Sequence, residues 1–351
     1  MSETSAPGRW SAARANAWYD KLPWLVGANF VPSTASNQLE MWQPETFRPD
    51  VIARELDWAA SVGMNTMRVF LHDLLWAADP VGFRQRIEHY LDIAAGRGIS
   101  TMLVLFDSVW NPDVALGTQP EPRPGVHNSQ WVQGPGRALA DPSQHARLCD
   151  YVQGVVGAFA HDERVLVWDI WNEPSNLNGG RFKELDNKVE LVSALLPQAF
   201  AWARAAEPSQ PLTAGVWAGA TLYDDPHARI QIENSDIISF HDYQTPERFS
   251  AKIADLPRDR PLFLTEYMAR TPGSTFEGIL PIAKRERIAS YCWGLVAGRS
   301  QTLYPWDSWS KPYVEAMPDP WFHDVFHGDG RPYREGEVAL LREITGRGKT
   351  G

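Results

Sequence analysis

Short runs of apolar residues alternate along the chain with amphipathic stretches. Each run is bounded by turn residues, and together they predict strands at 24–30, 66–71, 101–106, 165–171, 212–217, 237–241, 261–266 and 302–306. The runs are continuously apolar, which is typical of parallel strands covered on both faces. The clearest amphipathic segments predict helices at 49–62, 83–97, 143–160, 183–206, 282–298 and 335–344.

This alternation favours one α/β domain over residues 1–351, with residues 1–20 as an N-terminal extension. Eight strands interleaved with helices are typical of a (β/α)8 barrel. A doubly wound sheet remains possible, but no Gly-x-Gly-x-x-Gly motif follows the first apolar run, where a dinucleotide-binding fold would carry it. We therefore expect a single (β/α)8 barrel.

Two long segments interrupt the alternation, one after the third predicted strand and one after the eighth. Residues 111–142 are rich in Pro and Gly and contain His127, Asn128 and Trp131. A stretch of this length without regular structure is usually functional or disordered. We expect it to fold over the barrel mouth, and residues 307–332, which contain Trp309, Tyr313 and Trp321, are similar.

The charge balance argues against two classes of partner. The chain has 33 Lys and Arg against 43 Asp and Glu, a net charge of −10. An acidic chain without a basic run favours neither nucleic acid nor an anionic membrane as its main partner. No apolar stretch predicts a leader or a membrane span, so we expect a soluble, cytoplasmic protein. The oligomeric state stays open.

The sequence contains none of the motifs that would indicate a metal or a cofactor. Cys149 and Cys292 form neither a Cys-x-x-Cys motif nor a zinc spacing. There is no His-x-His after the first strand, no His-Glu-x-x-His, no Gly-x-Ser-x-Gly and no P-loop. We therefore expect catalysis, if any, to use side chains alone.

Tryptophan is abundant, with 16 residues beside 10 Tyr and 14 Phe. The simplest explanation is a large core, in which each indole N–H needs a partner. The alternative is a cleft lined with flat rings, on which the apolar faces of sugars stack. The composition alone does not decide between them.

Polar and aromatic residues follow the predicted strands at their carboxyl ends, where barrel enzymes carry their chemistry. In chain order these residues are Asn29, Arg68, His72, Asp107, Trp110, Asn172, Glu173, Trp217, His241, Tyr243, Glu266 and Trp306. Trp131 lies in the long loop after the third strand. We expect all of them to converge on one rim of the barrel.

Glu173 and Glu266 are the centre of the functional hypothesis. They end the fourth and seventh strands, which lie on opposite sides of an eight-stranded barrel, so they can face each other across its mouth. A retaining glycosidase needs two carboxyl groups about 5–5.5 Å apart. Burial and a neighbouring carboxylate would keep one of them protonated, and Arg68 with a tyrosine hydroxyl would keep the other ionised. Taken singly, each glutamate is equally compatible with a surface ion pair.

The same motifs resemble those of clan A glycoside hydrolases, in particular family 5 with its cellulases, mannanases and related glycosidases, and chains labelled as β-1,4-xylanases. The resemblance is carried by Arg68 in TMRVF, Asn172-Glu173-Pro174 in WDIWNEP, His241-Asp242-Tyr243, Glu266 in LFLTEY and Trp306. They follow one another in the order of the clan, so the resemblance covers nearly the whole barrel.

The resemblance implies a role for each matching position. Glu173 would be the general acid/base and Glu266 the nucleophile, while Asn172 would donate to the sugar 2-hydroxyl. Arg68 and Tyr243 would hold Glu266, His241 would lie near Glu173, and Trp306 would form the sugar platform. No cofactor or metal is implied. Rim residues with weaker support as substrate contacts are Asn29, His72, Asp107, Trp110, Trp131 and Trp217.

We therefore expect a retaining O-glycoside hydrolase that acts on β-linked oligosaccharides or glycosides. A transglycosylase is an alternative, since water and sugar hydroxyls compete for one intermediate. A carbohydrate-binding barrel without catalysis is another, although it would not need both glutamates. A barrel enzyme of unrelated chemistry would place them far apart. The sugar and the choice between endo and exo cleavage stay open.

Overall fold

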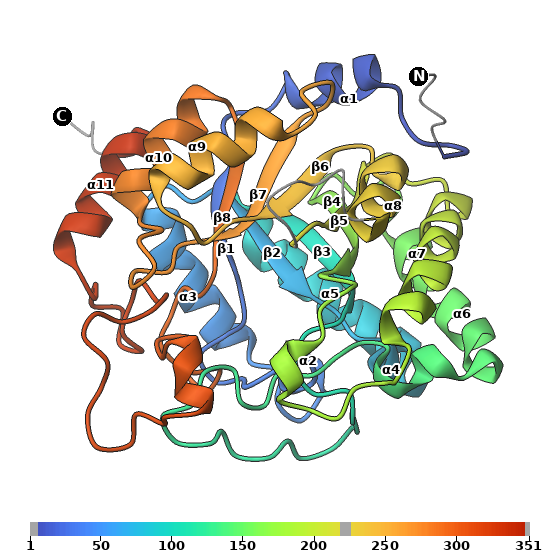
Figure 1. The fold of residues 1–351 in the computed structure, drawn as a ribbon, viewed down its shortest axis with the longest axis horizontal. Coiled ribbons are helices and arrows are strands. Elements are labelled where there is room, and N and C mark those ends of the chain that lie inside the picture. The colour runs from blue at the N-terminus through green and yellow to red at the C-terminus, as the bar shows by residue number, and fades with distance from the viewer. Residues whose placement is uncertain (1–5, 218–225, 348–351) are drawn as a thin grey trace.

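The structure is a computed structural model that describes residues 6–217 and 226–347. At its centre lies an eight-stranded parallel sheet in the order β5-β4-β3-β2-β1-β8-β7-β6. Its strands are β1 (Val26–Asn29), β2 (Thr66–Phe70), β3 (Ser100–Asp107), β4 (Val165–Asn172), β5 (Leu212–Gly215), β6 (Ile238–His241), β7 (Leu262–Tyr267) and β8 (Ala289–Cys292). A parallel bridge between Val216 and Phe240 joins the β5 and β6 ends of this order (Figure 1). The predicted (β/α)8 barrel is confirmed.

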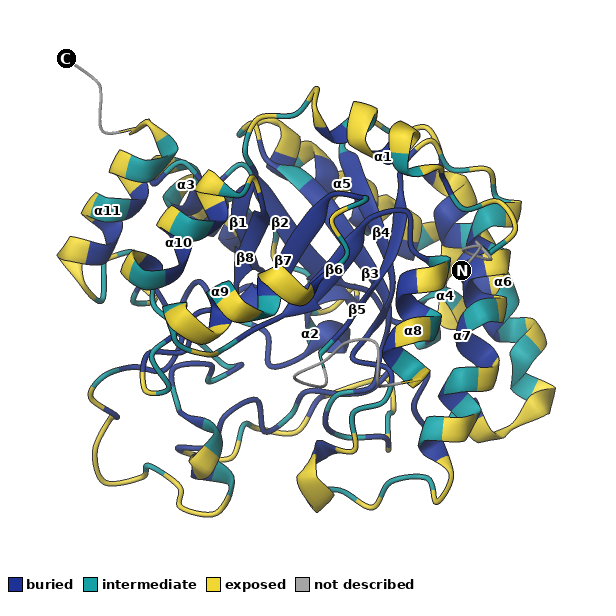
Figure 2. Ribbon diagram, turned by 45° about the horizontal axis from the view of Figure 1, so that its top comes forward, coloured by how far each residue is buried: buried dark blue, intermediate teal, exposed yellow. Residues whose placement is uncertain are grey.

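Helices surround the sheet and turn their polar faces outward, while the strands are buried (Figure 2). On α5, for example, Phe83, Ile87, Tyr90 and Leu91 recur every three or four residues and are buried, the spacing of one helix face. The α-helices are α1 (Ala12–Tyr19), α2 (Gln38–Trp42), α3 (Pro49–Ser61), α4 (Asp73–Ala78), α5 (Pro80–Ala95), α6 (His145–Ala158), α7 (Lys188–Ala205), α8 (Pro226–Asn234), α9 (Pro246–Asp255), α10 (Phe276–Arg285) and α11 (Glu335–Thr345). Short 3-10 helices are η1 (Gly136–Ala140), η2 (Pro142–Gln144), η3 (Asn178–Gly180) and η4 (Trp306–Trp309). The sequence pattern did not predict α1, α2, α4, α8 or α9.

The eighth strand lies elsewhere than the sequence pattern predicted. Residues 302–306 are not a strand; β8 is formed by Ala289–Cys292, inside the segment 282–298 that was predicted to be helical. The four residues of β8 are all buried and pair with both β1 and β7. A strand this short carries too few residues to show a period of its own beside the strong helical pattern of α10. Trp293, not Trp306, is therefore the residue that directly follows β8.

The N-terminal part of the chain closes the amino-terminal end of the barrel. Tyr19 of α1 packs on Phe263 with ring centroids 5.4 Å apart, and Phe263 stacks on Tyr291. Met102 and Val167 join this apolar cluster from β3 and β4. Polar chemistry is thus confined to the opposite end. Residues 1–5 of the predicted extension lie outside the described residues.

The long segments after β3 and β8 lie on the carboxyl side of the barrel (Figure 1). Between Ser108 and Gln144 the chain forms only bends, turns, bridges and the 3-10 helices η1 and η2, and between Trp293 and Arg334 only η4 interrupts such structure. No helix within residues 6–217 and 226–347 has the length and apolar character needed to cross a membrane. The cytoplasmic location stays a prediction.

Candidate active site

A cleft of about 530 Å³ opens at the carboxyl ends of the strands. Both glutamates of the sequence hypothesis lie in it, together with residues from the segments after β3, β4, β5, β6 and β8. Its polar lining includes Asn172, Glu173, Asn176, Asn178, Arg181, His241, Asp242, Gln244, Lys252 and Glu266. Its aromatic lining includes Trp110, His127, Trp217, Tyr243, Trp293 and Trp306.

The structure brings Glu173 and Glu266 together across the barrel mouth. One carboxylate oxygen of each, and a ring nitrogen of His241, all lie within 4.8 Å of one another. Glu266 stands within β7, paired in register with His241 of β6. Glu173 directly follows β4 with a φ of +44°, a left-handed conformation that is uncommon for residues other than glycine and is often found at functional sites.

Two donors hold the carboxylate of Glu266. Arg68 Nη1 donates to Oε1 at 3.0 Å and the Tyr243 hydroxyl donates to Oε2 at 2.8 Å. The Nδ1 atom of His241 lies 3.5 Å from Oε2. Burial and the neighbouring Glu173 raise the pKa of Glu266 above its ordinary value, while Arg68 and Tyr243 oppose that rise. The arrangement favours a buried but ionised carboxylate.

Arg68 is fully buried and organises this side of the cleft. Its guanidinium donates to Asp169 Oδ2 at 2.7 and 3.0 Å, and Asp169 with Glu266 balances its charge. It also donates to Asn29 Oδ1 at 2.8 Å and to Asn172 Oδ1 at 2.6 Å. A rigid fork of donors fixes which way both amides point. The sequence analysis missed Asp169, although a charged residue inside an apolar strand always needs a partner.

Glu173 has a different set of neighbours. Its Oε1 shares a 2.7 Å hydrogen bond with His241 Nδ1, and its Oε2 accepts a 2.6 Å hydrogen bond from the Asn176 amide. Burial raises the pKa of Glu173 to about 7. Burial also lowers the pKa of His241 to about 4, so its imidazole is neutral near pH 7. Glu173 thus lies where a carboxyl group can hold a proton at neutral pH.

His241 is packed tightly between β5 and the two glutamates. A Cβ atom added to Gly215 would lie 2.9 Å from His241 Nε2 and 3.6 Å from Arg68 Nη2. The Nε2 atom has no hydrogen-bond partner among the described residues. A buried unpaired acceptor is less costly than a buried unpaired donor, which favours the tautomer in which Nδ1 carries the proton and donates to Glu173. Glycine at 215 leaves the space that this ring requires.

Two lysines that the sequence analysis did not single out support the ends of β3, β4 and β6. Lys188 is buried and donates to the backbone carbonyls of Ser108 and Asn176 at 2.8 and 2.7 Å. Lys252 donates to the carbonyl of His241 at 2.7 Å. Because both side chains come from helices far along the chain, no local motif marks them. Lys188 positions the segment that carries Asn176, and Asn176 in turn contacts Glu173.

Besides the buried Arg68, three predicted rim residues lie beneath the cleft and not on its surface. Asn29 accepts from Arg68, and Asp107 accepts from Asn172 Nδ2 at 3.0 Å. His72 shares a 2.8 Å hydrogen bond with the carbonyl of Gln133 and caps α4 through Leu74. None of the three lines the cleft. Asn29 and Asp107 therefore position other site residues. The hydrogen bonds of His72 hold the segment after β3 and the start of α4, and do not reach a residue of the catalytic pair.

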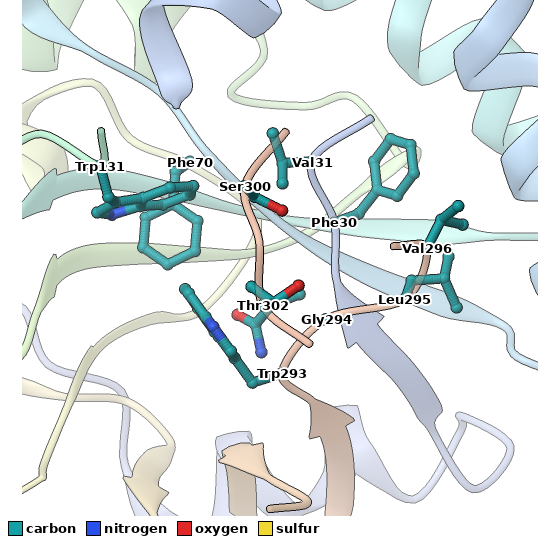
Figure 3. Close-up of a pocket in the computed structure, with 11 residues that line it drawn as sticks. Phe30, Val31, Phe70, Trp131, Trp293, Gly294, Leu295, Val296, Ser300 and Thr302 are labelled. Carbon is teal, nitrogen blue, oxygen red and sulfur yellow. The ribbon is translucent and has the colours of Figure 1, made fainter. Parts of the chain in front are cut away.

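The predicted tryptophans divide between two places. Trp110, Trp217 and Trp306 line the cleft, with the ring of Trp306 edge-on to Tyr243 at 5.1 Å. Trp131 instead donates from Nε1 to Asp107 Oδ2 at 2.7 Å and packs against Phe70 in a neighbouring niche. Figure 3 shows Trp131, Phe70 and Trp293 gathered around this niche. Trp293 lines both the niche and the cleft, and it was missed because the eighth strand was placed too late in the sequence.

The catalytic pair and its histidine also lie close enough together to bind one metal ion: Glu173, His241 and Glu266 each offer one ligand atom. The oxygens of Glu266 already receive hydrogen bonds from Arg68 and Tyr243, and the positive charge of Arg68 lies 3.0 Å from Oε1. That charge opposes a metal ion at the same carboxylate. The donor geometry therefore fits proton transfer and nucleophilic attack better than metal binding.

Comparison with known proteins identifies relatives by family and by fold. A family model described as Cellulase (glycosyl hydrolase family 5) matches residues 33–285. No curated protein matches the sequence significantly.

Solved structures share the fold at low sequence identity. A family 5, subfamily 18 protein from Streptomyces cattleya, in complex with Manβ1-4GlcNAc, is 14% identical with a TM-score of 0.62, over 93% of this chain and 81% of that one. An exo-β-1,4-mannosidase from Opitutaceae bacterium strain TAV5 is 18% identical with a TM-score of 0.62, over 99% of this chain and 63% of that one. A β-1,4-mannanase from the sea hare Aplysia kurodai is 15% identical with a TM-score of 0.54, over 77% and 87%. The family match confirms the resemblance seen in the motifs, and the chain belongs to glycosyl hydrolase family 5 and is a glycoside hydrolase.

Proposed function

We propose that this protein is a retaining glycosidase that cleaves β-linked glycosides by double displacement. The observation that carries the proposal is the close approach of the two carboxylates, whose nearest oxygens lie within 4.8 Å. Retaining enzymes hold their two carboxyl groups about 5–5.5 Å apart, whereas inverting enzymes need about 6.5–9.5 Å to admit a water molecule between the general base and the sugar.

In the first step an oxygen of Glu266 bonds to the anomeric carbon while the glycosidic carbon–oxygen bond breaks. Glu173 gives its proton to the departing oxygen, and a covalent glycosyl ester of Glu266 remains. A pKa of about 7 supplies the protonated form that this step requires. The Arg68 and Tyr243 donors keep Glu266 ionised before the attack.

In the second step water takes the place of the leaving group. Glu173 removes a proton from the water, the water oxygen bonds to the anomeric carbon, and the ester bond to Glu266 breaks. Formation of the ester has by then removed the negative charge of Glu266. A nearby negative charge disfavours ionisation of a carboxyl group, so loss of the Glu266 charge favours the ionised form of Glu173, and the same residue changes from acid to base.

Other residues of the cleft support binding of the sugar at the reaction centre. Asn172 uses one amide hydrogen for Asp107 and has a second one for the sugar 2-hydroxyl. Trp293 and Trp306 line the cleft near Tyr243 and supply aromatic faces for a pyranose. The structural neighbours with mannoside names make a β-mannoside the first substrate to test, beside the gluco, xylo and galacto forms.

A trapping experiment tests the proposal. The protein is incubated with activated 2-fluoro β-glycosides that differ in the sugar, and the intact mass and peptide map are recorded. We expect a stable adduct of one glycosyl unit on Glu266 for the sugar that the site accepts. An adduct on another carboxylate contradicts the assignment of the nucleophile, and inverted product stereochemistry by NMR contradicts the retaining mechanism. Transfer of the glycosyl unit to added sugar in preference to water would identify a transglycosylase.

A further inference from the structure

The cleft is open on one side of the catalytic pair and closed on the other. The leaving group lies beside Glu173, the proton donor. On that side the cleft is lined from the segments after β4, β5 and β6, including Arg181, Trp217 and Gln244. The sugar that is attacked lies over Glu266 of β7. A further sugar attached to its non-reducing end, continuing straight away from Glu173, would pass over the neighbouring strands β8, β1 and β2.

Side chains fill the space above β8, β1 and β2. Trp131 meets Phe70 at 5.1 Å and Trp293 at 5.7 Å between ring centroids, and Phe70 meets Trp293 at 5.8 Å, all nearly edge-to-face. Val31, Ser300 and Thr302 are among the other residues that line the niche in Figure 3. The space left among these residues is about 10 Å³, roughly the room that one water molecule needs. A second pyranose does not fit there.

Phe70, Trp131 and Trp293 together form what we call the wall. It is held in place by hydrogen bonds between the segment after β3 and the segment after β8. The N–H of Asn128 donates to the carbonyl of Ser300 at 3.1 Å, and the N–H of His127 donates to Ser308 Oγ at 2.9 Å. The N–H of Tyr313 donates to the carbonyl of Gly125 at 3.0 Å.

Gly125 lets the two segments approach this closely. Its φ is +71°, and an added Cβ atom would meet the backbone of Tyr313 at 2.5 Å. Two further bonds anchor the wall to the segment after β1: Asn37 Nδ2 donates to the carbonyl of Gln130 at 2.9 Å, and Gln38 Nε2 donates to the carbonyl of Val132 at 2.9 Å. The wall is therefore part of the packed structure.

Two buried polar residues of the segment after β3 belong to the lining of the cleft. His127 and Asn128 both line the cleft although they are 2% and 1% exposed. His127 Nδ1 lies 2.8 Å from the carbonyl of Tyr304; since a carbonyl only accepts, Nδ1 carries the proton and Nε2 is an acceptor. Burial lowers the pKa of His127 to about 4, which keeps the ring neutral. Asn128 Oδ1 is a second acceptor, buried without a partner among the described residues.

We propose that this glycosidase is exo-acting: it binds one terminal sugar against the wall, recognises its free hydroxyls through His127 and Asn128, and releases it from the non-reducing end. The inference rests on the proposed function. A neutral imidazole acceptor binds a free hydroxyl but has no donor for a glycosidic oxygen, so it distinguishes a chain end from a chain interior.

Reducing-end-labelled β-1,4 oligosaccharides of the accepted sugar test the mode of cleavage. We expect the labelled oligosaccharide to become shorter by one sugar at a time, and monosaccharide to be the only unlabelled product. The same oligosaccharide with its terminal 4-hydroxyl methylated should be cleaved at least about 100-fold more slowly. Internal cleavage, or equal cleavage of the methylated chain, overturns the exo inference and leaves the proposed function standing if an aryl β-glycoside is still hydrolysed. Absence of aryl glycoside hydrolysis overturns the proposed function itself.

Recognition of the hydroxyls is tested by combining His127→Ala with monodeoxy aryl glycosides. For one deoxy position the wild-type protein should lose about 10-fold in kcat/KM, the usual effect of one hydrogen bond. On the parent glycoside, kcat/KM of His127→Ala should be lower than that of wild type by a similar factor. For His127→Ala, replacing the parent glycoside by that deoxy compound should cause no further decrease in kcat/KM. His161→Ala, an exposed site, is the matched control and should behave as wild type. Equal sensitivity of His127→Ala and wild type to every deoxy position overturns the role of His127, and thermal unfolding shows whether the variant is folded.

Discussion

The ends of β7 and β4 carry the same side chain in two different surroundings. Glu266 receives a hydrogen bond from a buried guanidinium and another from a tyrosine hydroxyl. Among the described residues, the Glu173 carboxyl group has only a neutral imidazole and an amide as direct partners. Both are buried, so desolvation acts on both, and the difference lies in the charge of the donors. The comparison teaches that the role of a carboxylate in this cleft is assigned by its donors.

Removal of the Glu266 carboxylate should have the largest effect. Glu266→Gln keeps the shape but removes the nucleophile, so kcat/KM should fall by a factor on the order of 10⁴ or more on every substrate. Initial rates on an activated aryl glycoside and on an oligosaccharide measure the change. Glu247→Gln, at an exposed position on α9, should leave both rates unchanged. A residual rate within 10-fold of wild type would remove Glu266 from the mechanism.

Removal of Glu173 should have an effect that depends on the leaving group. For a poor leaving group, Glu173→Ala should cost about 10²–10⁴-fold in the first step, the usual value of general acid catalysis. For an activated phenol, which needs no proton to depart, the first step should be nearly unaffected. A series of aryl glycosides with increasing phenol pKa measures how the loss in rate depends on the leaving group. The same loss throughout the series would mean that Glu173 is not the acid.

The pH profile sharpens the comparison further. Since burial raises the pKa of Glu173 to about 7, the residue is protonated below that pH and loses its proton above it. The kcat/KM of wild type on a poor leaving group should therefore fall as the pH rises through about 7. In Glu173→Gln this basic limb should vanish, and its persistence would assign it to another group.

Tyr243→Phe removes a donor from Glu266 without removing its counter-ion. We expect a loss of about 10–100-fold, as for a charge-assisted hydrogen bond of about 1.5–3 kcal/mol. Because the hydroxyl opposes the raised pKa of Glu266, its removal should raise that pKa further. The acid limb of the kcat/KM profile should then move to higher pH while the basic limb stays in place. If the basic limb moved instead, the Tyr243 hydroxyl would be acting on the pKa of Glu173, which would contradict the assignment of this donor to Glu266 alone.

Gly215→Ala tests the packing of His241 and should have the smallest effect. The new methyl group would lie 2.9 Å from His241 Nε2, so the ring has to move away and its bond to Glu173 changes. We expect a loss of about 10-fold in kcat with little change in the unfolding temperature. Gly336→Ala on α11 is the control, since a Cβ there meets nothing within 4 Å. Equal rates for the two variants would show that the position of His241 is not critical.

Local pattern and motif spacing were enough to predict the barrel and to single out the two glutamates. The strands β3 and β4 are mostly apolar runs of eight residues that end in Asp107 and Asn172, and β7 carries Glu266 next to its last residue, so each places a polar side chain at the carboxyl end of the barrel. The prediction failed at β8, whose four residues are too few to show a period. That error concealed Trp293, which lines the cleft together with Trp306.

For every strand except β8, the sequence by itself indicated where the strand ends, because strand length and burial follow from consecutive residues. Only the tertiary structure decided what surrounds those ends. Asp169 and Lys188 act on partners from other strands and segments, and the wall of Trp131, Phe70 and Trp293 joins three separate parts of the chain. Such contacts join segments that are far apart in the sequence, so they cannot be predicted from a local hydrophobic period or from a motif.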